Sequence, residues 1–375
     1  MSPAVVELLS ELVGFPTQQS SPDRGPGDEL ALCRHVAPLL EARGADEVAV
    51  VDAGRGADDQ GHGGYVYARW GQPTLVVNAH VDTVPANTGW SRDPWTATVV
   101  GDRLHGLGAC DTKGAIAAAI VALDRVRPRD VALLFSGDEE RGTASMRHFL
   151  SSPRRRGLER AIVCEPTARV AGVRHRGVLA YRATTRGEGG HSSRADHMQR
   201  PVATLARLAV LLDDLGRARV GDGPADMPGL CLNVAALEGG LAFNVVPTSA
   251  ALTWSVRPWP GFDRAAWDRE LAAMIASVER TTGATIALEF VTDHAPFGVD
   301  DAALAALVAG HARALVGLDF WTEAALYQAA GMSAIVIGPG DIAQAHAADE
   351  FVTLADLDWA VELFTHVYQS SRRDG

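Results

Sequence analysis

The segment LVVNAHVDTVP, residues 75–85, constrains the fold of this chain more than any other part of the sequence. It begins with an apolar run that predicts a short buried strand. Because the side chains of a strand alternate between its two faces, His80 and Asp82 are expected to point the same way from its carboxyl end. A neighbouring carboxylate often orients an imidazole that binds a metal, although a structural histidine beside a turn aspartate gives the same pattern. The segment therefore indicates a metal site only if further ligands occur elsewhere.

Three more acidic clusters, and a second histidine, follow apolar runs further along the chain. Asp111 lies in GLGACDTKG directly before a predicted helix, where an N-cap is the alternative interpretation. Glu139 and Glu140 follow a second predicted strand, and Glu165 follows a third. His346 comes after a fourth strand and the turn sequence GPG. Open α/β sheets place their chemistry at the carboxyl ends of strands, so these side chains are expected to meet.

Two histidines and four carboxylates suffice for two metal ions. Each ion would have one histidine and one carboxylate of its own, and Asp111 would be shared. Two ions about 3.5 to 4 Å apart can activate a water and polarise a carbonyl oxygen. The remaining glutamate can act as a general base. Neighbours in the chain point in different directions, so one of Glu139 and Glu140 can bind a metal while the other faces the water.

Composition excludes several other classes of protein. The 375 residues are 47% hydrophobic, which is enough for a large core, and the length is more typical of two domains than of one. The net charge of -12 is spread along the chain without a basic patch, which argues against a nucleic acid or membrane partner. Four cysteines without a C-x-x-C pair favour a reducing cytoplasm. The amino terminus lacks the features of a signal peptide.

The pattern of elements predicts a second domain inserted into the first. Between residues 177 and 290 the order is strand, helix, two strands, helix, strand, which is the ferredoxin-like βαββαβ order. Residues 1–176 and 291–375 are expected to rejoin as one doubly wound α/β domain that carries the metal site.

The motifs HVDTVP, GLGACDTKG, FSGDEE, CEPT, GGHSS and QAHAADEF, in this order and at these separations, resemble the M20 family of metallopeptidases and deacylases. The likeness covers nearly the whole chain. It implies that His80 and Glu165 bind one metal ion, that Glu140 and His346 bind the other, and that Asp111 bridges the two. The ions are expected to be zinc, with cobalt or manganese as alternatives.

The resemblance also implies roles outside the ligand set. Asp82 would orient His80, and Glu139 would be the general base. The inserted domain would pair two subunits into a homodimer, and His191 would reach into the active site of the partner to stabilise an oxyanion. Asn244 and Arg257 resemble family positions that hold the substrate, although a turn asparagine and a surface arginine are equally good explanations. From the residues themselves, Glu323 could face the substrate or be a structural acid at a helix start, and Gly338 and Gly340 would leave backbone N–H groups free for a carboxylate.

The expected reaction is removal of an acetyl group from an N-α-acetyl amino acid, with acetylornithine or acetylcitrulline in arginine biosynthesis as first candidates. A succinyl-diaminopimelate desuccinylase or a dipeptidase is the alternative within the family, and a metal-free binding protein is the alternative from another class. Cys110 and Cys164 are expected to pack in the core. For His105 and His175 the sequence indicates no role beyond packing or hydrogen bonding.

Overall fold

A computed structural model describes residues 3–18, 27–55 and 62–371. The chain divides into two compact units. The first comprises residues 1–173, 299–316 and 322–375, and the second comprises residues 174–298 and 317–321. The expected boundaries, at 176/177 and 290/291, lie close to these limits, but the short return of the chain at 317–321 was not expected.

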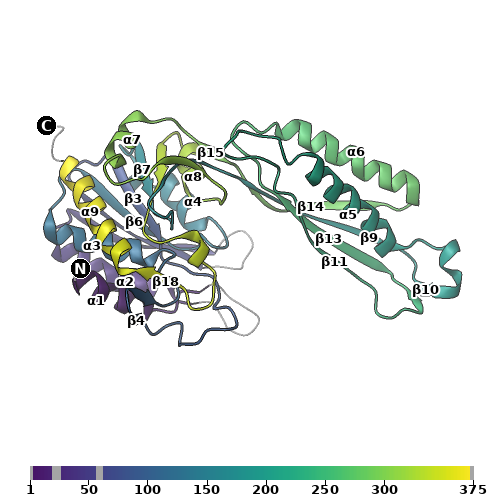
Figure 1. The fold of residues 1–375 in the computed structure, drawn as a ribbon, viewed down its shortest axis with the longest axis horizontal. Helices are drawn as coiled ribbons and strands as arrows, with labels where there is room; N and C mark the ends of the chain where they lie inside the picture. Colours follow the sequence, from purple (N-terminus) through teal and green to yellow (C-terminus); the bar gives the residue numbers. More distant parts are fainter. Residues whose placement is uncertain (1–2, 19–26, 56–61, 372–375) are drawn as a thin grey trace. The chain divides into compact units, whose positions relative to one another are not determined.

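The first unit is built on a mixed sheet (Figure 1). Its strands follow the order β1-β2-β6-β3-β7-β17-β8. Their bounds are β1 Glu47–Arg55, β2 His62–Trp70, β3 Leu75–His80, β6 Val131–Ser136, β7 Arg160–Val163, β8 Ala171–His175 and β17 Ser333–Val336. The four central strands β6, β3, β7 and β17 are parallel, so their carboxyl ends meet at one edge. β1, β2 and β8 are antiparallel to their neighbours, which makes the sheet mixed.

Helices cover both faces of this sheet. On β2, Tyr65 and Tyr67 pack against Phe149 of α4. Val66 and Ala68 point the other way, into the core formed with α1, α2, α3 and α9. The helices of this unit are α1 Pro3–Val13, α2 Glu29–Ala42, α3 Lys113–Arg125, α4 Ala144–Ser151, α7 Ala302–Val308, α8 Ala324–Ala329 and α9 Leu354–Ser370. Short 3-10 turns occur at η1 Pro153–Arg155 and η3 Ile342–Gln344.

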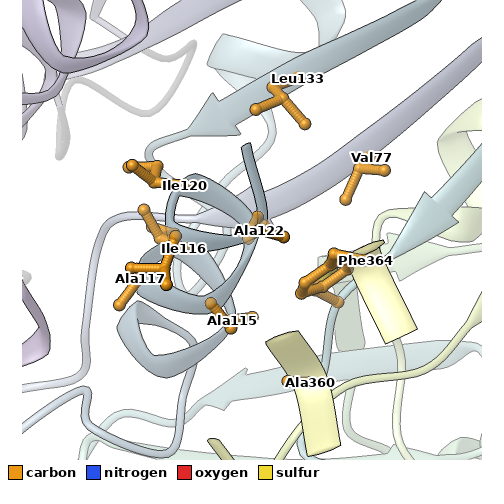
Figure 2. Close-up of a cluster of buried hydrophobic side chains, with 14 of the residues drawn as sticks. Val77, Ala115, Ile116, Ala117, Ile120, Ala122, Leu133, Ala360 and Phe364 are labelled. Atoms are coloured by element: carbon orange, nitrogen blue, oxygen red, sulfur yellow. The ribbon is translucent and has the colours of Figure 1, made fainter. Parts of the chain in front are cut away.

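The centre of the core lies where α3 packs between the sheet and α9 (Figure 2). Ile116 and Ile120 of α3 are fully buried, and alanines elsewhere on this helix let it pack closely. Val77 of β3 and Phe364 of α9 complete the cluster. This packing fixes the start of α3 against the carboxyl ends of the central strands, which is where Asp111 lies.

A small sheet with the order β18-β5-β4 belongs to the same unit. Its strands are β4 Thr98–Val100, β5 Arg103–His105 and β18 Phe351–Thr353. α9 begins directly after β18, and Thr353 caps it by accepting a hydrogen bond from the backbone of Asp356.

The second unit has the expected strand and helix order. Its main sheet is antiparallel, in the order β11-β13-β9-β14, and α5 and α6 pack on it through a core of their own. The elements are β9 Val178–Arg186, α5 Pro201–Ala218, β11 Asn233–Gly239, β13 Ser249–Val256, α6 Arg264–Thr282 and β14 Ile286–His294. The smaller elements are β10 Gly190–His191, η2 Ser192–His197, β12 Val245–Val246 and β15 Phe297–Gly298, and β16 Leu315–Leu318 crosses the boundary between the units. Among the described residues, no helix combines the length and the apolar character that a membrane span requires.

Candidate metal centre

The expected ligands come from the carboxyl edge of the four parallel strands. His80 is the last residue of β3, Glu140 lies shortly after β6, and Glu165 lies two residues beyond β7. His346 follows β17 and η3, and Asp111 immediately precedes the cap of α3. All five residues belong to the first unit.

Four of these side chains form a continuous chain of contacts. His80 Nε2 lies 3.0 Å from Asp111 Oδ1, and Asp111 Oδ2 lies 3.4 Å from His346 Nε2. His346 Nε2 in turn lies 2.9 Å from Glu140 Oε1. The ligand atoms offered by His80, Asp111 and Glu140 all lie within 4.8 Å of one another. Asp111 therefore lies between the two histidines, which is the position that a shared ligand requires.

Burial and mutual repulsion govern the ionisation of the carboxyls. Burial raises the pKa of Glu165, and the negative charges of Asp111 and Glu140 raise it further, although His80 opposes them. Burial also raises the pKa of Glu140, against the hydrogen bond from His346. Asp111 differs, because the two histidines bonded to it outweigh its burial and lower its pKa.

The pKa values of the two histidines are also raised, because neighbouring carboxylates favour the protonated ring. Hydrogen bonds to Asp111 and Glu140 raise the pKa of His346 to about 10, despite its partial burial. For His80, burial favours the neutral ring, but the hydrogen bonds with Asp111 and Asp82 and the charge of Glu165 together outweigh burial and raise the pKa. Buried carboxylates in such number need opposing positive charge, and oxygen and imidazole nitrogen donors suit a divalent transition metal. The donor set therefore fits the metal ions that the sequence indicates.

Asp82 holds the backbone of the acidic loop. Its carboxylate oxygens accept hydrogen bonds from the N–H groups of Glu139 and Glu140, at 3.1 and 3.0 Å. His80 Nδ1 lies 3.0 Å from the main-chain carbonyl oxygen of Asp82 and 3.6 Å from its carboxylate. The ring is thus bonded to the Asp82 backbone, while the carboxylate fixes the two glutamates.

Glu139 lies beside the ligands without being part of their chain of contacts. Burial raises the pKa of its carboxyl group well above the usual value, and the charge of Glu165 adds to this effect. A carboxyl group with a raised pKa is a stronger base than an ordinary carboxylate, which suits it to accept and return a proton.

The expected substrate residues of the first unit have partners within the protein. Glu323 is 2% exposed, and its Oε2 accepts a hydrogen bond from Ser136 at 2.8 Å. Glu323 precedes α8 but makes no capping hydrogen bond, and burial raises its pKa to about 7. The N–H of Gly338 donates to Thr167 at 3.2 Å. The prediction that this N–H is free for a substrate carboxylate is therefore wrong. Gly340 has a φ of +86°.

The remaining candidates lie in the second unit, where two of them are neighbours. β10 pairs with β12 so that His191 lies opposite Val245, and the carbonyl oxygen of Asn244 accepts the N–H of Ser192 at 3.1 Å. His191 and Asn244 are both exposed. Arg257 is half-buried, burial lowers its pKa, and no carboxylate pairs with its guanidinium among the residues that the structure describes.

His191 has a defined tautomer when its ring is neutral. Its Nδ1 accepts a hydrogen bond from the backbone N–H of Ser193 at 3.2 Å and lies 2.8 Å from the hydroxyl of that residue. A backbone N–H can only donate, so Nδ1 is unprotonated and Nε2 carries the hydrogen.

Three residues that support the site were not singled out from the sequence. Thr112 Oγ1 donates to the carbonyl oxygen of His80 at 2.8 Å and accepts its N–H at 3.0 Å. Thr112 also occupies the N-cap position of α3, without a capping hydrogen bond from its side chain, so the interpretation of Asp111 as the N-cap is wrong. Lys113 is buried and donates to the carbonyl oxygen of Phe15, and burial lowers its pKa to about 7. Burial raises the pKa of Glu350 to about 8, and its carboxylate accepts backbone N–H groups near Asp111. All three lie inside the motifs GLGACDTKG and QAHAADEF, which was the available signal.

Two histidines and two cysteines that the sequence places near the motifs make packing or hydrogen-bond contacts within the protein. His105 Nδ1 lies 2.9 Å from the carbonyl oxygen of Asp349, and the ring packs on Phe351. His175 is fully buried in the second unit, where it contacts Phe297. Cys110 and Cys164 are free, buried thiols, and burial raises the pKa of each.

Comparison with known proteins identifies the family of the chain. The family model described as Peptidase family M20/M25/M40 matches residues 76–370. N-acetyl-L-citrulline deacetylase of Xanthomonas campestris pv. campestris is 35% identical, over 98% of each chain. Acetylornithine deacetylase of Proteus mirabilis is 27% identical, over 98% of this chain and 97% of its own.

A solved structure shares the fold. The YXEP protein of Bacillus subtilis, described as a dinuclear metal-binding peptidase of the M20 family, matches with a TM-score of 0.68 at 15% identity. The match covers 97% of this chain and 96% of that one. By sequence and by fold, the chain belongs to peptidase family M20/M25/M40 and is a hydrolase.

Proposed function

We propose that this hydrolase is a two-metal deacetylase that releases acetate from an N-α-acetyl amino acid with a polar side chain, acetylcitrulline or acetylornithine. The observation that carries the proposal is the contact chain His80–Asp111–His346–Glu140 at the strand ends, in a chain 35% identical to an N-acetyl-L-citrulline deacetylase. Zinc is the first candidate for both ions, with cobalt and manganese as alternatives. The four free cysteines support a cytoplasmic location.

Each residue of the centre has a role in this proposal. His80 and Glu165 hold one ion, Glu140 and His346 hold the other, and Asp111 is shared. Bound divalent ions supply Lewis acidity and lower the pKa of a coordinated water. Glu139 accepts the proton of the attacking water and gives it to the leaving α-amine. Asp82 fixes the backbone of Glu139 and Glu140 by accepting their N–H groups, and its main-chain carbonyl oxygen orients the ring of His80.

The second unit is proposed to be the dimerisation domain. The exposed Nε2–H of His191 is a donor suited to a developing oxyanion in the partner subunit. Asn244 lies directly before β12, next to the β10–β12 strand pair, and would bind the same substrate. The guanidinium of Arg257 would hold the substrate α-carboxylate, for which a bidentate fork is well shaped. Glu323 and Gly340 remain candidate contacts for the rest of the substrate.

Metal affinity should depend steeply on pH. Because the pKa of His346 is raised to about 10, its ring is protonated in the metal-free protein between pH 6.5 and 9 and must lose that proton to bind an ion. Raising the pH removes the proton, so the apparent zinc affinity should rise at least about tenfold per pH unit. Competition with a chromophoric chelator measures it, and His35→Gln, a change at a surface histidine, should leave the slope unaltered. A flat profile over this range would contradict the assignment.

Glu139→Gln should separate chemistry from metal binding. The amide keeps the shape of the side chain but cannot accept a proton, so kcat should fall about 10²- to 10⁴-fold while two metals stay bound. Metal analysis and steady-state kinetics on the same preparation test this. Glu140→Gln is the matched control, because it removes a ligand and should lose metal. If the two variants lost metal equally, the roles of the neighbouring glutamates would be reversed.

Mixed dimers test the role of His191. His191→Ala and Glu139→Gln should each be inactive, yet a mixture that exchanges subunits should regain about one quarter of wild-type activity, because half of the dimers are mixed and one of their two sites is intact. Glu139→Gln mixed with Glu140→Gln is the control and should recover nothing, since both defects lie in the same chain's part of the site. Absence of recovery after exchange is verified with tagged subunits would mean that His191 does not act across a dimer.

A substrate series decides the reaction. The values of kcat/KM for acetylcitrulline, acetylornithine, acetylmethionine, succinyl-diaminopimelate and a simple dipeptide should be highest for the first two compounds. We expect this order because relatives 35% and 27% identical to the chain are named for these two substrates, and because the proposed arginine fork suits an α-carboxylate. A clear preference for the succinyl compound or the dipeptide would overturn the substrate assignment and leave the metal centre standing.

A further inference from the structure

A five-residue segment, 346–350, links two parts of the metal centre. It begins with the proposed ligand His346 and ends at β18. His346 and Asp349 have φ values of 58° and 55°, a region that residues other than glycine enter when surrounding contacts hold them there. The contacts around this segment therefore decide where His346 lies.

Hydrogen bonds from residues outside the segment hold it in place. Asn87 Nδ2 donates to the carbonyl oxygen of His346. The backbone N–H and the hydroxyl of Ser91 donate to the two carboxylate oxygens of Asp349, at 2.9 and 2.7 Å. The N–H of Gly106 donates to the carbonyl oxygen of Glu350 at 3.1 Å. The backbone of Glu350 is thus fixed next to β5, and its side chain starts from a rigid point.

The side chain of Glu350 turns inward, toward the other part of the centre. It is 2% exposed, and its Oε1 accepts the backbone N–H groups of Cys110 at 2.9 Å and Asp111 at 3.1 Å. These two residues are 240 and 239 positions away in the chain. Both are also buried, so no water replaces this acceptor easily.

We propose that Glu350 is a positioning residue for Asp111, the shared ligand of the metal pair. The inference rests on the two-metal site proposed above. A side chain bonded to the N–H of a ligand residue fixes the backbone from which the ligand extends, and so sets the place of its carboxylate. Glu350 does not contact substrate or metal; it acts through the Cys110–Asp111 backbone.

Removal of the acceptor should weaken the binding of metal. In Glu350→Ala, two buried N–H groups lose their partner, and the loop before α3 rearranges to reach water. Loss of such supporting hydrogen bonds typically weakens metal affinity about 10- to 100-fold. Zinc titration of the stripped protein with a competing chelator measures the affinity. The visible absorption of the cobalt-loaded protein reports the altered coordination without any activity assay.

Asp301→Ala is the matched control. Asp301 Oδ1 also accepts two backbone N–H groups, those of Ala303 and Leu304, but at the start of α7. Asp301 also pairs with Arg160 at the amino end of β7, opposite the edge that carries the ligands. This variant should lower the melting temperature of the stripped protein and keep wild-type zinc affinity. Equal loss of affinity in both variants, or unchanged affinity in Glu350→Ala, would overturn the proposal.

Glu350→Asp distinguishes position from charge and serves if the alanine variant fails to fold. It keeps the carboxyl group but withdraws the oxygens by one methylene, so it should also bind zinc more weakly than the wild type. Wild-type affinity in this variant would show that the position of the oxygens does not matter, and would overturn the positioning role. Asp111→Asn tests the premise: if it kept both metals at wild-type affinity, the shared ligand itself would be wrongly assigned, and the proposed centre would fail rather than the role of Glu350 alone.

Discussion

The concentration of buried carboxylates at one edge of the sheet is the constraint on which the rest of this structure depends. Asp111, Glu140 and Glu165 face one another beside only two imidazoles, and burial raises the pKa of the two glutamates. Of these three carboxyl groups, only Asp111 has a lowered pKa, because both histidines bond to it. Such a set is costly without added cations and becomes favourable with them. The fold therefore has to hold like charges together before any ion is bound.

The chain holds these charges together through the backbone. Two carboxylates outside the proposed ligand set accept the backbone N–H groups of residues that belong to this set. Asp82 accepts that of Glu140, and Glu350 accepts that of Asp111. Each hydrogen bond fixes the main chain from which a proposed ligand extends. Each also pairs the accepting carboxylate with a backbone N–H group rather than with another side chain. The ligand geometry is thereby set by the strand ends and by the start of α3, which the core packing around Phe364 makes rigid.

The parts of this arrangement that are local in sequence could be predicted. A short apolar run followed by polar residues identifies a buried parallel strand and its carboxyl end, and this pattern located His80 and Glu165. The supporting contacts could not be predicted in the same way. Thr112 rather than Asp111 takes the N-cap position of α3, and its hydroxyl bonds to His80 in a neighbouring strand instead of capping the helix. Glu350 reaches a loop 239 residues earlier, and no periodic pattern contains such a pairing. The same holds for the N–H of Gly338, whose partner Thr167 comes from another strand end.

In the second unit, a two-strand pairing gives chemical meaning to a histidine that the sequence places only in a glycine-rich loop. β10 and β12 bring His191 beside Asn244, although the helix α5 and the strand β11 separate them in the chain. The backbone N–H of Ser193 then forces the neutral ring to carry its hydrogen on Nε2. An exposed ring donor and an exposed amide thus share one strand pair. An exposed neutral donor suits an anionic group, because it offers a hydrogen bond without a fixed positive charge. The two units therefore differ in chemistry: the first concentrates carboxylates at one edge of its sheet, and the second presents an exposed ring donor on a short strand pair.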